Sequence, residues 1–237
     1  MAGSLSLLRR FYLVAYNWIV FAGWQFIYLI VISLSSQCFR FQVLFLALKT
    51  LKESGHEHVY SNIEKPLLLA QSAAFLEILH GIVGLVRSPI SATLPQISSR
   101  LYVVWGILYS FPEVQTHPIV SSLVISWCIT EIIRYSFFGT KEAFGSTPYW
   151  MLWLRYSTFL VLYPTGIASE IGMIYNALPY MKESELYSIR MPNKWNFSFD
   201  YFYFAFVVLA IYVPGIPHLY GYMLAQRKKT LAKSKKA

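Results

Sequence analysis

Residues Leu154 to Glu170 read LRYSTFLVLYPTGIASE. The run is apolar enough for a membrane helix, yet it contains a phenol, Tyr163, and a carboxylate, Glu170. Residues seven positions apart on a helix are separated by almost two turns, so these two groups face the same way, about 10 Å apart along the axis. Ionisable groups at membrane depth cost free energy and are functional-site hypotheses by default. The stretch therefore predicts a membrane helix that presents an acid/base pair to a substrate.

The same helix carries further features. Tyr156 lies seven residues before Tyr163 and joins its stripe. Pro164 and Gly166 predict a kink or local unwinding, which changes the direction in which the side chains of Tyr163 and Glu170 point.

The composition of the chain indicates whether it lies in water or in a membrane. Of 237 residues, 56% are hydrophobic and 13% are charged, against about 25% charged in an ordinary soluble domain. The chain is therefore predicted to be an integral membrane protein. Its net charge of +9 comes from Lys and Arg at the ends of apolar runs and at the C-terminus, which indicates membrane topology and excludes a nucleic-acid partner. Cys38 and Cys128 have no paired spacing, so neither a disulfide framework nor a zinc site is predicted.

Six apolar runs approach the roughly 20 residues that cross a bilayer, which predicts an all-α, single-domain bundle of six transmembrane helices. The first run has no signal-peptide cleavage site and is interpreted as a retained span. Residues Phe39 to Leu48 extend it, form a second short membrane segment or lie on the interface; the sequence leaves these alternatives open. The six spans are expected near Phe11 to Leu34, Leu67 to Val86, Ile97 to Phe111, Ile119 to Phe138, Trp150 to Ile174 and Phe199 to Leu219.

The basic residues predict the orientation of the spans. Arg9 and Arg10 precede the first span, and residues 226–237 form a basic tail after the last, so both termini are expected in the cytoplasm. The loop from Pro112 to Pro118, which lacks Lys and Arg, falls on the other side. The loop from Lys182 to Lys194 disagrees with this orientation, because it places three basic residues on the side opposite the cytoplasm.

Four segments carry a family resemblance. The segments are HGIVGLVRS (His80 to Ser88), TEIIRYSFF (Thr130 to Phe138), LRYSTFLVLYPTGIASE and YSIRMPNKWNFSFDY (Tyr187 to Tyr201). In this order they resemble the 3-hydroxyacyl-coenzyme A dehydratases of very-long-chain fatty acid elongation, also called protein tyrosine phosphatase-like A proteins, and in particular their plant type. The similarity extends from Met1 to the basic tail.

This resemblance implies a six-span protein of the endoplasmic reticulum membrane that converts 3-hydroxyacyl-coenzyme A to the trans-2-enoyl product. The family's catalytic tyrosine and glutamate correspond to Tyr163 and Glu170. The implied partners are the ketoacyl-CoA synthase, ketoacyl-CoA reductase and enoyl-CoA reductase of the elongation cycle. One departure is that residues Gln25 to Phe41 resemble an insertion.

The chemistry of dehydration agrees with this resemblance. A base must take a proton from the carbon next to the thioester while an acid protonates the departing hydroxyl. Glu170 as base and Tyr163 as donor is the favoured assignment, although exchanged roles fit the sequence equally well. No metal or cofactor is needed. The structural alternative is a tyrosine of an aromatic membrane belt beside a glutamate that is hydrogen-bonded in a packed bundle.

Other polar residues in the spans have two interpretations each. Glu131 and Arg134 are three apart and either form an ion pair or contact substrate. Arg155 either meets a phosphate of coenzyme A or extends to the lipid headgroups. Arg155, Tyr156 and Arg134 are thus the candidate substrate-binding residues. Glu77 and His80 are too few for a metal site.

Two further function classes remain as alternatives. HGIVGLVRS follows the outline of a phosphatase loop, but Gly81 stands where the nucleophilic cysteine belongs and has no side chain that attacks phosphorus. This leaves a non-catalytic phosphate binder, or a scaffold or transporter without chemistry. Finally, Lys233 and Lys235 in the terminal KSKKA resemble a dilysine retrieval signal of the endoplasmic reticulum, or else complete the positive anchor of the tail.

Overall fold

The computed structural model describes residues 39–82 and 90–234. The chain divides into two compact units, Met1–Cys38 and Phe39–Ala237, and the description concerns the second unit. The described residues form helices and one isolated bridge pair, Ile189 with Phe199, which confirms the all-α prediction. In chain order the elements are a helix over residues 39–53, η1 (His56–His58), α2 (Val59–Ile82), α3 (Ile90–Leu101), the π-helical η2 (Tyr102–Tyr109), η3 (Pro112–Val114), α4 (Pro118–Phe144), α5 (Tyr149–Ser157), α6 (Phe159–Ser184) and α7 (Tyr201–Ser234).

Three helical stretches in the described part of the chain are long and apolar enough to cross a membrane. They are Pro118–Lys141, Tyr149–Ser184 and Tyr201–Ala232. They overlap the last three predicted spans, and the second and third continue past the predicted ends at Ile174 and Leu219. The predicted spans from Leu67 and from Ile97 fall on α2 and on the continuous run of α3 and η2. The first predicted span lies outside the described residues, so the count of six remains a prediction.

Local sequence signals set the ends of α4. His117 is its N-cap, and its imidazole Nδ1 accepts a hydrogen bond from the amide of Ile119. Pro118 occupies the first helical position, where a missing amide proton costs nothing. Gly145 ends the helix in the left-handed conformation with φ of 69°, which a residue without Cβ adopts readily.

Helices α4 and α6 pack through small and hydroxyl-bearing side chains. Ser169 donates to Ser122 over 3.0 Å, and the hydroxyls of Ser126 and Thr165 lie 3.2 Å apart. Small residues let helix backbones approach closely, which is the usual basis of helix association in membranes. This contact fixes the position of α6 relative to α4.

The helix around Tyr163 differs from its prediction in one respect. Local unwinding at Pro164 and Gly166 was expected, but α6 runs helically through both residues, and the interruption lies earlier, at Thr158. The hydroxyl of Thr165 donates to the carbonyls of Val161 and Leu162, which reinforces the turn that surrounds the proline. Prolines are tolerated in membrane helices when such side chains satisfy nearby backbone groups.

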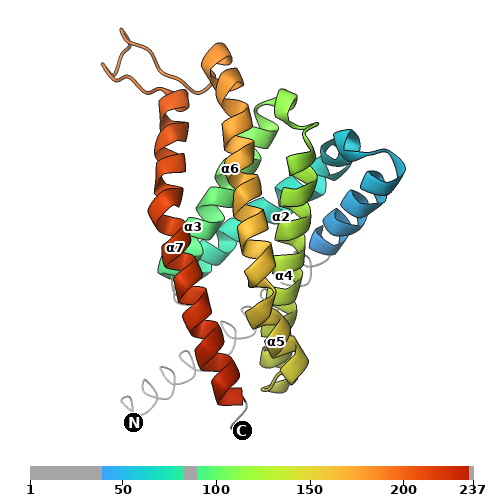
Figure 1. Ribbon diagram of the computed structural model, residues 1–237. Coiled ribbons are helices and arrows are strands. Elements are labelled where there is room, and N and C mark those ends of the chain that lie inside the picture. The colour runs from blue at the N-terminus through green and yellow to red at the C-terminus, as the bar shows by residue number, and fades with distance from the viewer. Residues whose placement is uncertain (1–38, 83–89, 235–237) are drawn as a thin grey trace, which may run out of the picture. The chain divides into compact units, whose positions relative to one another are not determined.

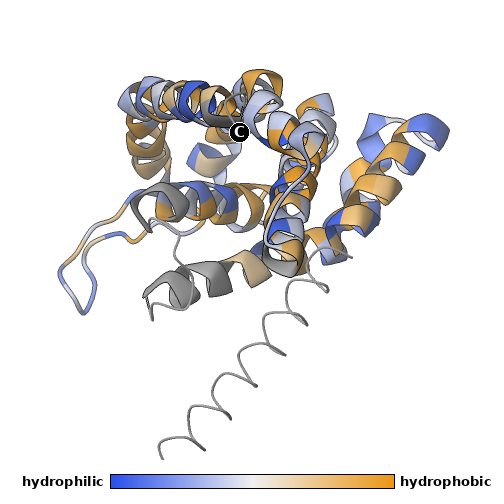
Figure 2. Cartoon of the chain, turned by 90° about the horizontal axis from the view of Figure 1, so that it is seen from below, coloured by the Kyte–Doolittle hydropathy of each residue, from blue (hydrophilic) through white to orange (hydrophobic). Residues whose placement is uncertain are grey.

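Exposed apolar side chains characterise α7, which lies beside α6 (Figure 1). Val207, Ile211 and Val213 are 55%, 64% and 73% exposed. Figure 2 shows apolar residues distributed around the helices instead of being confined to their inner sides. This is the surface expected of helices that are surrounded by lipid.

Candidate functional site

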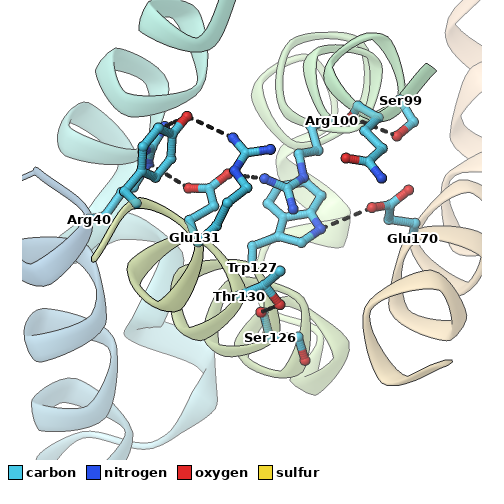
Figure 3. A network of polar contacts seen from close by, with 11 residues as sticks. Arg40, Ser99, Arg100, Ser126, Trp127, Thr130, Glu131 and Glu170 are labelled. Atoms are coloured by element: carbon cyan, nitrogen blue, oxygen red, sulfur yellow. Dashed lines mark hydrogen bonds and ion pairs between the residues drawn. The ribbon is translucent and has the colours of Figure 1, made fainter. Parts of the chain in front are cut away.

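The carboxylate of Glu170 is buried at the junction of three helices. Glu170 is only 6% exposed to solvent, and both of its carboxylate oxygens accept hydrogen bonds. From α4, the indole Nε1 of Trp127 donates to Oε1 over 2.9 Å (Figure 3). From α7, the hydroxyl of Tyr212 donates to Oε2 over 2.6 Å. The carboxylate is therefore held from two sides by neutral donors.

Tyr163 lies seven residues before Glu170 on α6, and its ring stacks on that of Tyr220 from α7. The ring centroids are 5.8 Å apart and the rings are inclined by 25°. The hydroxyl of Tyr163 is buried and has no hydrogen-bond partner among the described residues. A buried hydroxyl normally has a hydrogen-bond partner. The Tyr163 hydroxyl is therefore free to form a hydrogen bond with a bound substrate.

Both groups face α7. Helices α6 and α7 run antiparallel, joined at one end by the loop over residues 185–200 (Figure 1). Tyr163 therefore lies opposite Tyr220, and Glu170 lies opposite Tyr212. The structure brings the two predicted catalytic residues to one helix–helix boundary.

A second buried carboxylate, that of Glu131 on α4, lies in a different environment. Its Oε2 is 2.6 Å from Nε of Arg40, and its Oε1 pairs with Arg100. Figure 3 shows Glu131 between these two arginines. The guanidinium of Arg100 also lies 5.4 Å from the ring centroid of Trp127, the residue that donates to Glu170. The charge cluster and the Glu170 site are thus connected through Arg100 and Trp127.

This cluster extends the prediction for Glu131. The sequence left two interpretations for Glu131 and Arg134, an ion pair or contact with substrate. The structure adds Arg40 and Arg100, from two other helices, as ion-pair partners of Glu131. Arg134 donates to the hydroxyl of Tyr135 over 2.7 Å, and Arg40 donates to the same hydroxyl over 3.3 Å.

Arg40 also belongs to the segment Gln25 to Phe41 that resembled an insertion. The residue is 2% exposed and forms part of the helix over residues 39–53. The end of this segment is therefore integrated with α4, and its residues 25–38 lie outside the described part of the chain.

The candidate substrate-binding residues lie near the end of α5. The guanidinium of Arg155 is 5.8 Å from the ring centroid of Tyr156 and 5.9 Å from that of Phe138. Next to them, Arg227 of α7 donates from Nε to the hydroxyl of Ser157 over 3.4 Å. The basic end of α7 therefore meets the segment that carries Arg155 and Tyr156.

The structure bears on two further kinds of site, a metal site and a phosphate-binding loop. Within the described residues, no group of three or more His, Cys, Asp or Glu side chains is placed to hold a metal ion. The phosphatase-like outline begins at His80 and Gly81, and both lie in α2, which is helical to Ile82; its residues 83–88 fall outside the described part. A helix presents its backbone amides to its own carbonyls, whereas a phosphate-binding loop must point them at the ligand.

Comparisons with known proteins give a consistent result. A model of the family described as "Protein tyrosine phosphatase-like protein, PTPLA" matches residues 71–233. The chain is 67% identical over 236 residues to the very-long-chain (3R)-3-hydroxyacyl-CoA dehydratase PASTICCINO 2 of Arabidopsis thaliana, and the match covers 100% of both chains. It is 66% identical over 237 residues to PASTICCINO 2A of rice, again with 100% of both chains covered. The human very-long-chain (3R)-3-hydroxyacyl-CoA dehydratase 2 is 42% identical over 221 residues, which cover 93% of this chain and 81% of the human protein. No solved structure matches.

Proposed function

Because the chain belongs to the protein tyrosine phosphatase-like PTPLA family, we propose that it is a very-long-chain (3R)-3-hydroxyacyl-CoA dehydratase. It removes water from a 3-hydroxyacyl-CoA and releases the trans-2-enoyl-CoA. Similarity over the full length of two plant dehydratases supports this activity. The observation that carries the mechanism is a buried carboxylate and, seven residues earlier on α6, a buried hydroxyl without a hydrogen-bond partner among the described residues, both at the boundary with α7.

Glu170 and Tyr163 divide the proton transfers. Glu170 takes the proton from C2 of the acyl chain, and the electron pair of that C–H bond forms the double bond to C3. The C3–O bond breaks, and Tyr163 protonates the departing hydroxyl, which leaves as water. The hydrogen bonds support this assignment, because the Glu170 oxygens act as acceptors while the Tyr163 hydroxyl still has its proton to donate.

The two ends of the substrate need different surroundings. Arg155, with Tyr156 and Arg134, meets the phosphates of coenzyme A at the α5 end of the bundle. Arg155 precedes Glu170 by 15 residues, which corresponds to about 22 Å along a helix. Coenzyme A must therefore lie extended between the two residues for its thioester to reach Glu170. The acyl tail is buried among apolar helix faces, at about 0.8 kcal/mol per methylene.

The proposal extends to the cellular setting, which is supported by the family resemblance and by the positions of the basic residues. The protein lies in the endoplasmic reticulum membrane with six spans and with both termini in the cytoplasm, where its substrate is made. Its partners are the synthase and the two reductases of the elongation cycle. A membrane-embedded intermediate passes between such enzymes without leaving the bilayer.

The test is the conversion of a 20-carbon (3R)-3-hydroxyacyl-CoA by the purified full-length chain in detergent. We expect the trans-2-enoyl product from the unchanged protein and from Tyr175→Phe, a matched control whose side chain is 67% exposed on the same helix. Tyr163→Phe should lose most of the activity. A folded, unchanged protein that binds the substrate but forms no enoyl product would contradict the proposed function and leave the scaffold alternative.

A further inference from the structure

We propose, on the basis of the function above, that Tyr212 is a positioning residue that holds the Glu170 carboxylate in its working orientation. Its hydroxyl donates to Oε2 of Glu170 over 2.6 Å, a short distance typical of a hydrogen bond to a charged acceptor. Tyr212 acts through Glu170, keeps its own proton throughout and contacts no reacting atom.

The geometry explains why Glu170 needs a second donor. A glutamate has three rotatable side-chain bonds, so one hydrogen bond leaves its carboxylate free to pivot. Trp127 donates to Oε1 from α4, and Tyr212 donates to Oε2 from α7. Two donors on opposite oxygens fix the plane of the carboxylate and leave a lone pair on each oxygen for the proton of the substrate. Such support from surrounding groups keeps a reacting group in productive geometry.

Other contacts hold α7 in place. At the start of the helix, the hydroxyl of Tyr201 donates to the Gly106 carbonyl over 2.9 Å. Farther along, Tyr220 stacks on Tyr163, and Arg227 donates to Ser157. The Tyr212 hydroxyl is thus not required to attach the helix to the bundle, and its loss affects Glu170 first.

Tyr212→Phe tests this role, since it removes one oxygen atom and preserves the ring. We expect kcat for the 20-carbon (3R)-3-hydroxyacyl-CoA to fall about 10- to 100-fold, the usual effect of a lost hydrogen bond to a charged group. KM and the thermal unfolding temperature should change little. The matched control is Tyr222→Phe, an exposed tyrosine of the same helix, which should keep full activity.

A second measurement separates positioning from a structural role. In a Glu170→Gln background, adding Tyr212→Phe should lower kcat by less than twofold, because the group it positions has already been lost. A purely structural tyrosine would reduce kcat by the same factor in both backgrounds. Trp127→Phe, which removes the other donor, should reproduce the kcat defect and provides a second variant if Tyr212→Phe folds poorly.

The outcomes distinguish this proposal from the one it rests on. If Glu170→Gln and Tyr163→Phe lose most of their turnover while Tyr212→Phe and Trp127→Phe keep kcat within twofold, the positioning role is wrong and the proposed function stands. If Glu170→Gln keeps full turnover, the proposed catalytic pair itself is wrong. Equal losses of kcat from Tyr212→Phe with and without Glu170 would also overturn the positioning role.

Discussion

Two buried carboxylates of the bundle, Glu131 on α4 and Glu170 on α6, have different surroundings. Glu131 pairs with two arginines, whereas Glu170 accepts hydrogen bonds from a tryptophan and a tyrosine. Ion pairing stabilises the charged form of a carboxylate and reduces its ability to attract a proton. Glu170 accepts its hydrogen bonds from neutral donors, although the charge of Arg100 also acts on it. This difference supports the proposal that Glu131 is structural and that Glu170 takes part in the chemistry.

The structural role of Glu131 can be tested by Glu131→Ala. Removing one partner from a buried charge cluster is strongly destabilising, so we expect a loss of about 3 kcal/mol and a lower thermal unfolding temperature in detergent. Glu113→Ala, at an exposed position in η3, is the control and should leave the unfolding temperature unchanged. An unchanged unfolding temperature for Glu131→Ala would show that the cluster contributes nothing to stability.

At the residue scale, the sequence predicted what one helix contains and missed what several helices bring together. Tyr163 and Glu170 were recognised because both stand on one apolar run at helical spacing. Tyr212 and Trp127 were not, because aromatic residues are common in membrane helices and nothing local connects them to Glu170. Their role depends on the register between α4, α6 and α7, which is a tertiary property.

At the scale of elements, the backbone of η2 at Gly106 lies close to the side chain of Tyr201 from α7. A Cβ added to Gly106 would lie too close to the hydroxyl of Tyr201, which donates to the Gly106 carbonyl. The glycine is therefore needed for the approach of α7 to η2. The π-helical turn around it fits this reading, since such turns occur where a helix adapts to a local contact.

Gly106→Ala tests this contact. We expect a loss of about 1–3 kcal/mol of unfolding free energy, because the side chain of Tyr201 must move and its hydrogen bond must lengthen. Gly139→Ala on α4 is the matched control, since nothing lies within 4 Å of its added Cβ. Thermal unfolding of both variants measures the difference. Equal stability of the two would mean that the approach of Tyr201 does not require a glycine.

The ends of the elements were the least predictable feature. The last span was expected to end at Leu219, yet α7 continues to Ser234, beyond the basic residues Arg227 to Lys229. Hydropathy falls where charged residues begin, but the backbone remains helical because Lys and Arg are good helix formers. The fall in hydropathy therefore does not predict where the helix ends.

At the scale of the whole molecule, topology is the main prediction to test. Single cysteines introduced at Glu113, Lys141 and Trp195 in a chain without Cys38 and Cys128 report on which side of the membrane each of these positions lies. In sealed microsomes, a membrane-impermeant thiol reagent should label the cysteine at Lys141 and spare those at Glu113 and Trp195. Labelling of the cysteine at Glu113 before the membrane is permeabilised would contradict the six-span orientation.

Cellular location depends on the tail. Changing Lys233 and Lys235 to Ser leaves the basic residues Arg227 to Lys229 as an anchor, so topology should be preserved while the protein escapes toward the Golgi. Fluorescence imaging against markers of both compartments measures this change. An unchanged reticular pattern would show that the spans or the elongation partners retain the protein.

The central claim, that Tyr163 and Glu170 act together as acid and base, is tested most directly by the kcat of Tyr163→Phe, Glu170→Ala and the double variant on a 20-carbon (3R)-3-hydroxyacyl-CoA. Residues that act as one unit have non-additive effects on turnover. We expect each single variant to lose most of the activity, at least about 100-fold, with the double variant little worse than either. Near-normal turnover in either single variant, or a double variant whose loss equals the product of the two single losses, would contradict the claim.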